Sequence, residues 1–306
     1  MSDLEMTAPR AAPEKILQRL DWTVIRRLDG FLQGDYRTLF LGFGLDLADL
    51  REYQFSDDVR YIDWNVTARM VTPYVRQYIE DRDVTAWFLL DLSPSVDFGT
   101  TRARKRDLLI DFTIILARLL TRRGNRVGAI FYSGKIERVI PAHGGRIQVL
   151  RLINDLLNQP RLQRAPPTNL TMLLEAAARS IKRRSLLFIV SDFISTPGWD
   201  KPLALLAQRH EILAVRLVDP RESELPDIGT VIFEDAETGE QLFVDTHDRK
   251  FRERFLHNAR RREYEINVTL RRLGIDILTL STDDDLPQAI VRFALARKQR
   301  TRRPVK

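Results

Sequence analysis

The order of apolar and polar stretches from Val84 onward limits this chain to one class of fold. Continuous apolar runs, such as Val84–Leu90 and Leu186–Val190, alternate with longer stretches in which apolar residues recur at helical spacing. Runs without a polar face are typical of strands that are buried on both sides, and strands separated by helices pair in parallel. The sequence therefore predicts an α/β fold with a doubly wound, mostly parallel sheet.

The same pattern sets the expected bounds of each element. Strands are expected at Val84–Leu90, Arg126–Tyr132, Lys135–Ile140, Ser185–Val190, Ile212–Val218 and Ile275–Leu280. The third of these strands is expected to return antiparallel to the second. Helices are expected at Lys105–Arg122, Gly145–Leu157, Asn169–Arg183, Pro202–Arg209, His247–Leu273 and Leu286–Arg297. A further hairpin, formed by Val231–Phe233 and Gln241–Val244, is expected at an edge of the sheet.

The residues before Val84 have a different character. Residues 1–14 are rich in alanine and proline and are expected to form a disordered tail, whereas Lys15–Leu32 has the spacing of an amphipathic helix. From Gly34 to Tyr78, short polar segments that contain several tyrosines predict strands and loops. The expected organisation is an N-terminal extension over residues 15–80, packed on an α/β domain over residues 81–296, with a basic tail over residues 297–306.

Charged residues in the extension leave two interpretations open. They form either a partner-facing surface or an internal network that docks the extension on the sheet; they are Asp57, Asp58, Arg60, Asp63 and Arg69. We favour docking, because Ile62 and Trp64 alternate with the charges as inward-facing strand residues do.

Composition excludes several classes of site. The chain has no cysteine, which excludes disulfides, thiolate zinc sites and cysteine nucleophiles. The net charge is +7, but the last ten residues carry six basic side chains and no acid, so the remainder carries about +1. The basicity belongs mainly to the tail, and we expect no specific nucleic-acid binding. We also expect a cytoplasmic protein, because no apolar stretch could span a membrane and the first residues lack the apolar core of a signal peptide.

A short polar motif follows the first buried strand. Its sequence, Asp91-Leu92-Ser93-Pro94-Ser95, has the form D-x-S-x-S. In open parallel sheets, ligands bind outside the carboxyl ends of the strands, and one carboxylate with two hydroxyls offers hard oxygen ligands that suit Mg²⁺. On these five residues alone, the favoured interpretation is a turn in which Ser93 and Ser95 cap the next helix and Asp91 is a turn residue.

Two further oxygen ligands are expected at the same edge of the sheet. Thr168 precedes a predicted helix, and Asp192 directly follows the predicted strand Leu186–Val190. Taken singly, Thr168 could be a helix cap and Asp192 a loop residue. The ordered combination with D-x-S-x-S is much less expected by chance, and it favours a metal site.

This combination resembles the metal-ion-dependent adhesion site (MIDAS) of von Willebrand factor A domains, which has D-x-S-x-S on one loop, a Thr on a second and an Asp on a third. The segment Leu50–Arg69, LREYQFSDDVRYIDWNVTAR, is similar to the signature of the bacterial family DUF58. The similarity continues through Ser191-Asp192-Phe193 and Arg221–Asp227, and it covers Gly34 to Phe293. The chain departs from these patterns where glycine is common, with Ser56 in the DUF58 signature and with Pro167 and Phe193 in the second and third A-domain loops.

The resemblance implies a function as well as a fold. In A domains, the open coordination position of the metal accepts a carboxylate from a partner protein. Asp91 would then anchor Mg²⁺ or Mn²⁺, with Ser93 and Ser95 as direct ligands, Thr168 as a direct or water-mediated ligand, and Asp192 orienting a bound water. DUF58 proteins resemble partners of MoxR-type AAA+ ATPases, which implies an adaptor that acts in the assembly or maturation of client proteins and is not an enzyme.

The alternative is a Mg²⁺-dependent hydrolase or phosphatase that uses Asp91. The sequence offers little support for it, because none of the four histidines lies beside a strand-end ligand to act as a general base. Neither a nucleophile elbow nor a P-loop is present.

Overall fold

The computed structural model of the 306-residue chain describes residues 12–20, 49–54, 59, 62, 64–70, 72–77, 84–101, 103–162 and 164–301. The chain divides into two compact units. One is Leu41–Asp83, and the other combines Met1–Phe40 with Val84–Lys306.

The smaller unit contains a short helix that the sequence did not suggest. Strands β1 (Asp49–Glu52) and β2 (Tyr74–Gln77) pair antiparallel, and helix α4 (Trp64–Met70) lies between them in the chain. Trp64 is the first residue of α4, so the expectation that it alternates with the charged residues along a strand is wrong; the two-residue repeat of a strand does not apply in a helix. Asp57, Asp58, Arg60 and Asp63 lie outside the described residues.

The larger unit begins with helix α1 (Pro13–Leu20), which starts two residues before the predicted helix. Proline suits the first turn of a helix, where its missing N–H has no partner to lose. Leu17 and Leu20 are buried in the main core. Residues 21–48, which include the rest of the predicted helix, lie outside the described residues.

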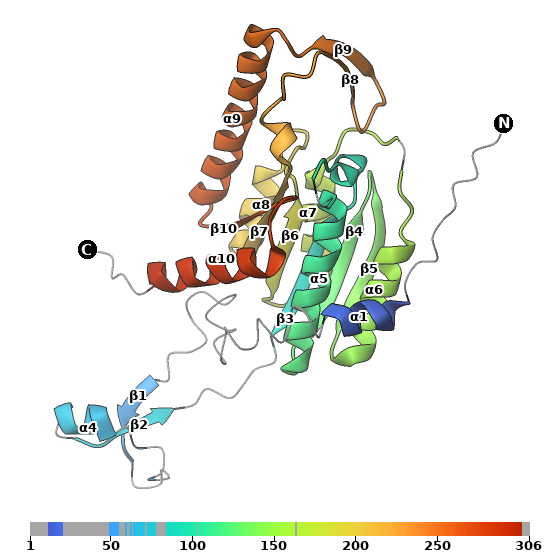
Figure 1. Cartoon of the computed structure of the whole chain (residues 1–306). Helices are drawn as coiled ribbons and strands as arrows, with labels where there is room; N and C mark the ends of the chain where they lie inside the picture. The colour runs from blue at the N-terminus through green and yellow to red at the C-terminus, as the bar shows by residue number, and fades with distance from the viewer. Residues whose placement is uncertain are drawn as a thin grey trace. The chain divides into compact units, whose positions relative to one another are not determined.

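A six-stranded sheet forms the centre of this unit (Figure 1), in the order β10-β7-β6-β3-β4-β5. The strands are β3 (Thr85–Asp91), β4 (Arg126–Tyr132), β5 (Ile136–His143), β6 (Leu186–Ser191), β7 (Glu211–Val218) and β10 (Asp276–Ser281). All pairings are parallel except that of β5, which returns antiparallel to β4 as expected. The predicted α/β fold with a doubly wound, mostly parallel sheet is confirmed.

Helices cover both faces of the sheet, and each face has its own core. One face packs against α1, α5 (Lys105–Arg122), α6 (Gly145–Asn158) and α10 (Leu286–Thr301). The other packs against α7 (Leu170–Ser180), α8 (Asp200–Ala207) and α9 (Arg249–Arg272). Burial on both faces explains why strands β3 and β6 are continuously apolar.

The order of the strands locates a preferred binding position. From β3 the chain passes to β4 on one side, and it later returns to β6 on the other side of β3. In open α/β sheets, ligands bind outside the carboxyl ends of the strands at such a reversal. The carboxyl ends of β3 and β6 carry Asp91 and Ser191-Asp192.

The second hairpin is not an edge of the main sheet, so that expectation is wrong. Strands β8 (Thr230–Glu234) and β9 (Gln241–Asp245) form a separate two-stranded sheet. The hairpin lies against helix α9, where Phe233 stacks on Phe255 with ring centroids 6.3 Å apart. Only residues 246–248 separate β9 from α9, and within the described residues β10 pairs only with β7.

Residue 297 does not begin a solvated tail, contrary to expectation. Helix α10 continues to Thr301, and Arg297 is buried. Its guanidinium pairs with Glu211 at 2.9 Å and with Asp276 at 2.8 Å. Arg297 therefore ties the last helix to the amino ends of β7 and β10.

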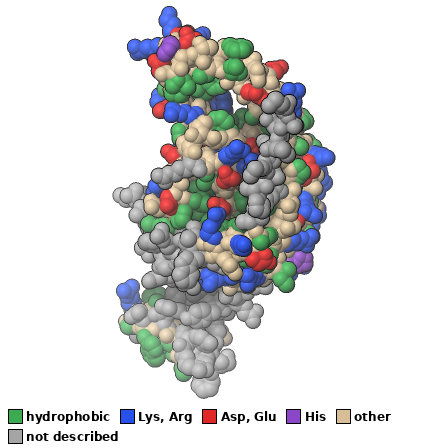
Figure 2. Space-filling model, turned by 45° about the vertical axis from the view of Figure 1, so that its right-hand side comes forward, with side chains coloured by type: hydrophobic (Ala, Val, Ile, Leu, Met, Phe, Trp, Pro, Cys, Tyr) green, Lys and Arg blue, Asp and Glu red, His purple; other side chains and the backbone are tan. Residues whose placement is uncertain are grey.

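Charges of both signs are mixed on one face of the molecule. On the face shown in Figure 2, Lys and Arg side chains of the described residues alternate with Asp and Glu side chains. Each described helix is too short or too polar to cross a bilayer.

Replacing Arg297 with alanine is expected to lower the free energy of unfolding by about 2 kcal/mol, because two carboxylates lose a largely buried partner. Arg292→Ala is the matched control on the same helix, since Arg292 is 65% exposed and its one ion pair within the described residues is with Asp284; its expected cost is below about 0.5 kcal/mol. Urea denaturation of both variants measures the difference. Equal losses would contradict a structural role for Arg297.

Candidate functional site

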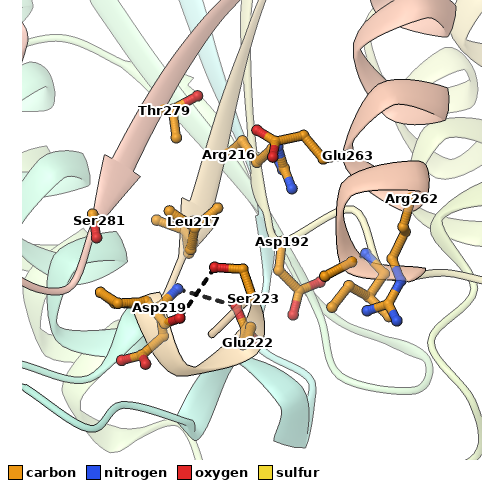
Figure 3. A pocket seen from close by; sticks show the side chains of 14 residues that line it. Asp192, Arg216, Leu217, Asp219, Glu222, Ser223, Arg262, Glu263, Thr279 and Ser281 are labelled. Carbon is orange, nitrogen blue, oxygen red and sulfur yellow. Dashed lines mark hydrogen bonds and ion pairs between the residues drawn. The ribbon is translucent and has the colours of Figure 1, made fainter. Parts of the chain in front are cut away.

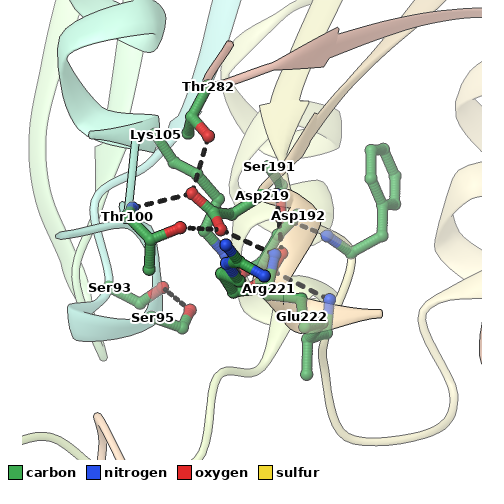
Figure 4. A network of polar contacts seen from close by, with 12 residues as sticks. Ser93, Ser95, Thr100, Lys105, Ser191, Asp192, Asp219, Arg221, Glu222 and Thr282 are labelled. Carbon is green, nitrogen blue, oxygen red and sulfur yellow. Dashed lines mark hydrogen bonds and ion pairs between the residues drawn. The ribbon is translucent and has the colours of Figure 1, made fainter. Parts of the chain in front are cut away.

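Asp91 ends strand β3 and is completely buried. Two groups donate hydrogen bonds to its carboxylate: the backbone N–H of Ser93 at 3.1 Å and the hydroxyl of Ser191 at 2.6 Å. The donors come from the loop after β3 and from the last residue of β6, so the carboxylate joins the two strands at the reversal of the sheet. Figure 4 shows Ser93, Ser95, Ser191 and Asp192 together with the polar network of Lys105 and Asp219.

The carboxylate of Asp91 carries an uncompensated negative charge. Burial raises its pKa to about 6 and repulsion from Asp192 adds to the rise, although the hydrogen bonds from Ser191 and Ser93 oppose it. Within the described residues, no lysine or arginine forms an ion pair with Asp91. A buried anion without a cation is a position that a divalent metal ion can stabilise.

Ser93 and Ser95 place two hydroxyls beside this carboxylate. Ser93 precedes the 3₁₀ helix η3 (Pro94–Asp97) but makes no side-chain capping bond. Its hydroxyl oxygen instead lies 3.1 Å from that of Ser95, within hydrogen-bond distance. The capping interpretation therefore fails for Ser93, and both hydroxyls are available as oxygen ligands.

Thr168 is buried and does not cap helix α7. The cap is Asn169, whose side chain accepts a hydrogen bond from the backbone N–H of Thr171. The hydroxyl of Thr168 donates to the carboxylate of Glu237, and its backbone N–H donates to the same carboxylate at 2.8 Å. Tyr132, at the end of β4, accepts from the N–H of Asn169 at 2.8 Å and so fixes this loop against the sheet.

Asp192 forms an ion pair with a buried lysine. Its Oδ2 atom lies 2.9 Å from Nζ of Lys105, and its Oδ1 atom accepts from the backbone N–H of Ile194 at 2.9 Å. Lys105 has no exposed surface and also contacts Glu222 at 2.6 Å. Burial alone would lower the pKa of Lys105, but the two carboxylates more than offset it and raise that pKa. Asp192 is therefore neutralised by the protein itself, unlike Asp91.

The loop after β6 has a backbone conformation that is unusual for its residue type. Phe193 has φ of 60°, which lies in the left-handed region that favours glycine. Its N–H donates to Ser191 Oγ at 2.9 Å, and its ring packs edge-on against Trp199. Packing and hydrogen bonding thus hold Phe193 in a backbone conformation that glycine adopts more readily.

Asp219 secures the segment that carries Glu222. It is buried, and its carboxylate accepts from both the N–H and the hydroxyl of Thr100, at 2.8 and 2.6 Å, and from the hydroxyl of Thr282 at 2.6 Å. Asp219 also caps the 3₁₀ helix η4 (Pro220–Glu222). These bonds lower the pKa of Asp219 despite the opposing effect of burial, and they hold Glu222 on Lys105 (Figure 4).

A pocket of about 290 Å³ opens beside Asp192. It is bounded by β7, η4, α9 and β10, and Figure 3 shows Arg262 of α9 reaching toward Asp192. On another wall, Arg216 pairs with Glu263 at 3.0 Å. Acidic and basic side chains both line the pocket, so it offers space next to the site without selecting one sign of charge.

Hydrogen bonds and electrostatic interactions bring together part of the set of residues that the sequence singled out. Asp91, Ser93 and Ser95 form a hydrogen-bonded series, and the charge of Asp192 acts on Asp91. Thr168 is linked to this group through Glu237, whose pKa is raised by burial and by repulsion from Asp192 and Asp235, against the hydrogen bonds from Thr168.

Sequence reasoning missed several functional groups: Lys105, Ser191, Glu222 and Glu237. Ser191 and Glu222 lie in the quoted DUF58 segments, and that was the available signal. Lys105 was recognised only as the start of a helix, and nothing in the local sequence distinguishes Glu237 from its acidic neighbours.

These residues fit a divalent cation only with the help of hydroxyl ligands. In the part of the chain that the structure describes, no three His, Asp or Glu side chains form a metal-binding group by themselves. The unpaired charge of Asp91 and the hydroxyls of Ser93, Ser95 and Thr168 supply oxygen donors of the kind that Mg²⁺ and Mn²⁺ prefer.

Comparison with known proteins identifies the family. A family model described as "Protein of unknown function DUF58" matches residues 49–265. The chain belongs to the DUF58 family. Among its relatives, the uncharacterized protein Rv1480 of Mycobacterium tuberculosis H37Rv is 37% identical over 285 residues, which cover 92% of this chain and 89% of Rv1480.

Other matches are more limited. The uncharacterized protein MAV169 of Mycobacterium avium is 38% identical over 160 residues, which cover 52% of this chain and 94% of MAV169. The crystal structure of the conserved hypothetical protein BatB from Bacteroides thetaiotaomicron aligns with this DUF58 protein at a TM-score of 0.46 and 13% identity, covering 71% of this chain and 99% of BatB.

Asp91→Asn is expected to stabilise the metal-free protein at high pH. The pKa of Asp91 in the folded state, about 6, lies above its ordinary value of 3.8, so folding favours the protonated form. The resulting penalty is absent below about pH 4 and develops as the pH rises through about 6, to a limit of about 3 kcal/mol. Asparagine keeps the shape without the charge.

Denaturation of the wild type and Asp91→Asn in EDTA, at about pH 4 and pH 8, tests this dependence. The variant should be more stable at the higher pH and similar at the lower. A variant that is less stable at both would show that the carboxylate contributes more through its hydrogen bonds than burial costs.

Proposed function

We propose that this DUF58 protein is a metal-dependent protein–protein interaction module. The observation that carries the proposal is the buried carboxylate of Asp91, which forms no ion pair with a lysine or arginine among the described residues and lies with Ser93 and Ser95 at the reversal of the sheet. Burying an ionised carboxylate costs several kcal/mol unless an opposite charge accompanies it. A divalent cation at this position offsets that cost.

The proposed ligands are Asp91, Ser93, Ser95 and Thr168, with Asp192 orienting a bound water. Bound Mg²⁺ or Mn²⁺ supplies a positive centre that attracts a carboxylate from another protein. Lys105 already neutralises Asp192, so Asp91 alone contributes an unpaired charge to the ligand set. The ion therefore keeps a net positive charge, which favours an external anion.

The partner assignment rests on resemblance to von Willebrand factor A domains and on kinship with DUF58 proteins. We propose that the chain acts as an adaptor for a MoxR-type AAA+ ATPase in chaperone-like assembly or maturation of client proteins. The doubly wound sheet is compatible with this assignment, but function belongs to the site rather than to the fold.

No observation favours a hydrolase over this binding role. A hydrolytic site needs a positioned general base or acid. Among the described residues, the histidines make no hydrogen bond to a carboxylate of the site; His247 contacts Asp227, and both ring nitrogens of buried His210 lack partners.

Mg²⁺ is expected to raise the melting temperature of the wild type and to leave that of Asp91→Asn unchanged. A ligand at about one hundred times its dissociation constant adds about 2.7 kcal/mol to the free energy of unfolding. Asp200→Ala is the control, because Asp200 is 41% exposed and only loosely paired with Arg272. Thermal denaturation with Mg²⁺ or EDTA gives the comparison. Equal stabilisation of the wild type and Asp91→Asn would contradict the site.

Partner recruitment is expected to depend on the same ion. Immobilised wild-type protein should retain the MoxR-type ATPase of its own organism in Mg²⁺, and should lose it in EDTA or after Asp91→Asn, whereas Asp200→Ala should retain it. Retention under all conditions would exclude metal-mediated recruitment. Hydrolysis of a generic phosphoester that disappears in Asp91→Asn would replace the binding role with catalysis.

A further inference from the structure

The β8–β9 hairpin brings a carboxylate from a distant part of the chain to the site. Glu237 lies in the turn of the hairpin, 69 residues after Thr168. Asp235 shapes this turn, because its carboxylate accepts from the backbone N–H groups of Glu237 at 2.9 Å and of Thr238 at 2.7 Å. The side chain of Glu237 is therefore presented by an ordered turn.

Glu237 binds Thr168, which is also a proposed ligand of the metal. Its two carboxylate oxygens accept from the N–H and the hydroxyl of Thr168, and its backbone carbonyl accepts from the N–H of Ala165 at 3.0 Å. Contact with a proposed ligand places the carboxylate at the rim of the site rather than elsewhere on the domain.

This placement adds negative charge where negative charge is already in excess. Repulsion from Asp192 contributes to the raised pKa of Glu237. The pKa of Tyr132 is raised by burial, and the negative charges of Asp91 and Glu237 add to the rise. Lys105, the buried cation beside these groups, is shared by Asp192 and Glu222. A third carboxylate at this position is favourable when a further cation is present.

The hairpin packs on the rest of the unit through few apolar side chains, among them Phe233, which stacks on Phe255 of α9. It pairs with no strand of the main sheet, and Val244 is its only buried hydrophobic residue within the described chain. At its base, Thr246 bonds to the carbonyl of Gly229, which has φ of 91°. A competitor that replaces the few polar bonds of Glu237 can therefore displace the turn, because little apolar packing opposes it.

We propose that Glu237 is an internal ligand of the metal site, holding the coordination position that a partner's carboxylate must take. This inference rests on the proposed function and adds a way to regulate partner binding: Glu237 of the hairpin closes the site until a carboxylate from a partner displaces it. The hydrogen bonds to Thr168 keep Glu237 in place, and they are lost when the hairpin lifts.

Mn²⁺ reports directly on this arrangement, since the relaxation of water protons depends on how many water molecules coordinate the ion. The proteins to compare are the wild type, Glu237→Gln, Glu237→Asp and the control Glu240→Gln, which alters an exposed side chain of the same turn. Glu237→Asp keeps the charge but shortens its reach by one methylene.

We expect Glu237→Gln and Glu237→Asp to bind Mn²⁺ about tenfold more weakly and to show a higher relaxivity per bound ion, because water replaces the carboxylate. Added acetate should then lower the relaxivity of these two variants and have little effect on the wild type or Glu240→Gln. A role for Glu237 in holding Thr168 alone would leave both the relaxivity and the acetate response unchanged.

The outcomes separate the two proposals. Mn²⁺ binding that requires Asp91, with equal relaxivity and equal acetate response in all four proteins, overturns the assignment of Glu237 and leaves the metal site intact. Mn²⁺ binding that survives Asp91→Asn, or is absent from the wild type, overturns the metal site and the internal ligand with it.

Discussion

Two buried carboxylates at the ends of adjacent parallel strands are the constraint on which the site depends. Register pairs Leu90 of β3 with Val190 of β6, so the acids that follow, Asp91 and Asp192, meet at the reversal of the sheet. Their charges are withdrawn from water, and burial together with their repulsion raises the pKa of Asp91 to about 6. Burying two ionised carboxylates costs free energy unless the surrounding loops supply hydrogen-bond donors or cations.

The two carboxylates are stabilised in different ways. Asp192 has a permanent cation in Lys105, which Glu222 and the η4 segment hold in place. Among the described residues, Asp91 is paired only with hydrogen-bond donors, from Ser93 and Ser191. That asymmetry supports the proposal of an exchangeable metal ion at Asp91. It also gives the approach of Glu237 a physical reason, because a carboxylate beside this cluster is costly without added positive charge.

The sequence predicted the fold well because the pattern that carries it is local. Helix α5 and strand β4 have the predicted bounds, and the other elements of the sheet differ by a few residues. Predictions failed where long-range contacts prevail. Trp64 begins a helix rather than facing inward from a strand, and Arg297 is held by β7 and β10 instead of forming a tail. Asn169, not Thr168, caps helix α7.

For the site, the sequence by itself determined the oxygen donors and their order, since D-x-S-x-S, Thr168 and Asp192 each follow or precede a recognisable element. It could not reveal that Lys105 neutralises Asp192, that Ser191 bonds to Asp91, or that Glu237 reaches Thr168. The residues that these contacts join are 69, 87 and 100 positions apart in the sequence. Only the tertiary structure decides them, because electrostatic and hydrogen-bond partners are selected by distance in space, and local periodicity carries no information about that distance.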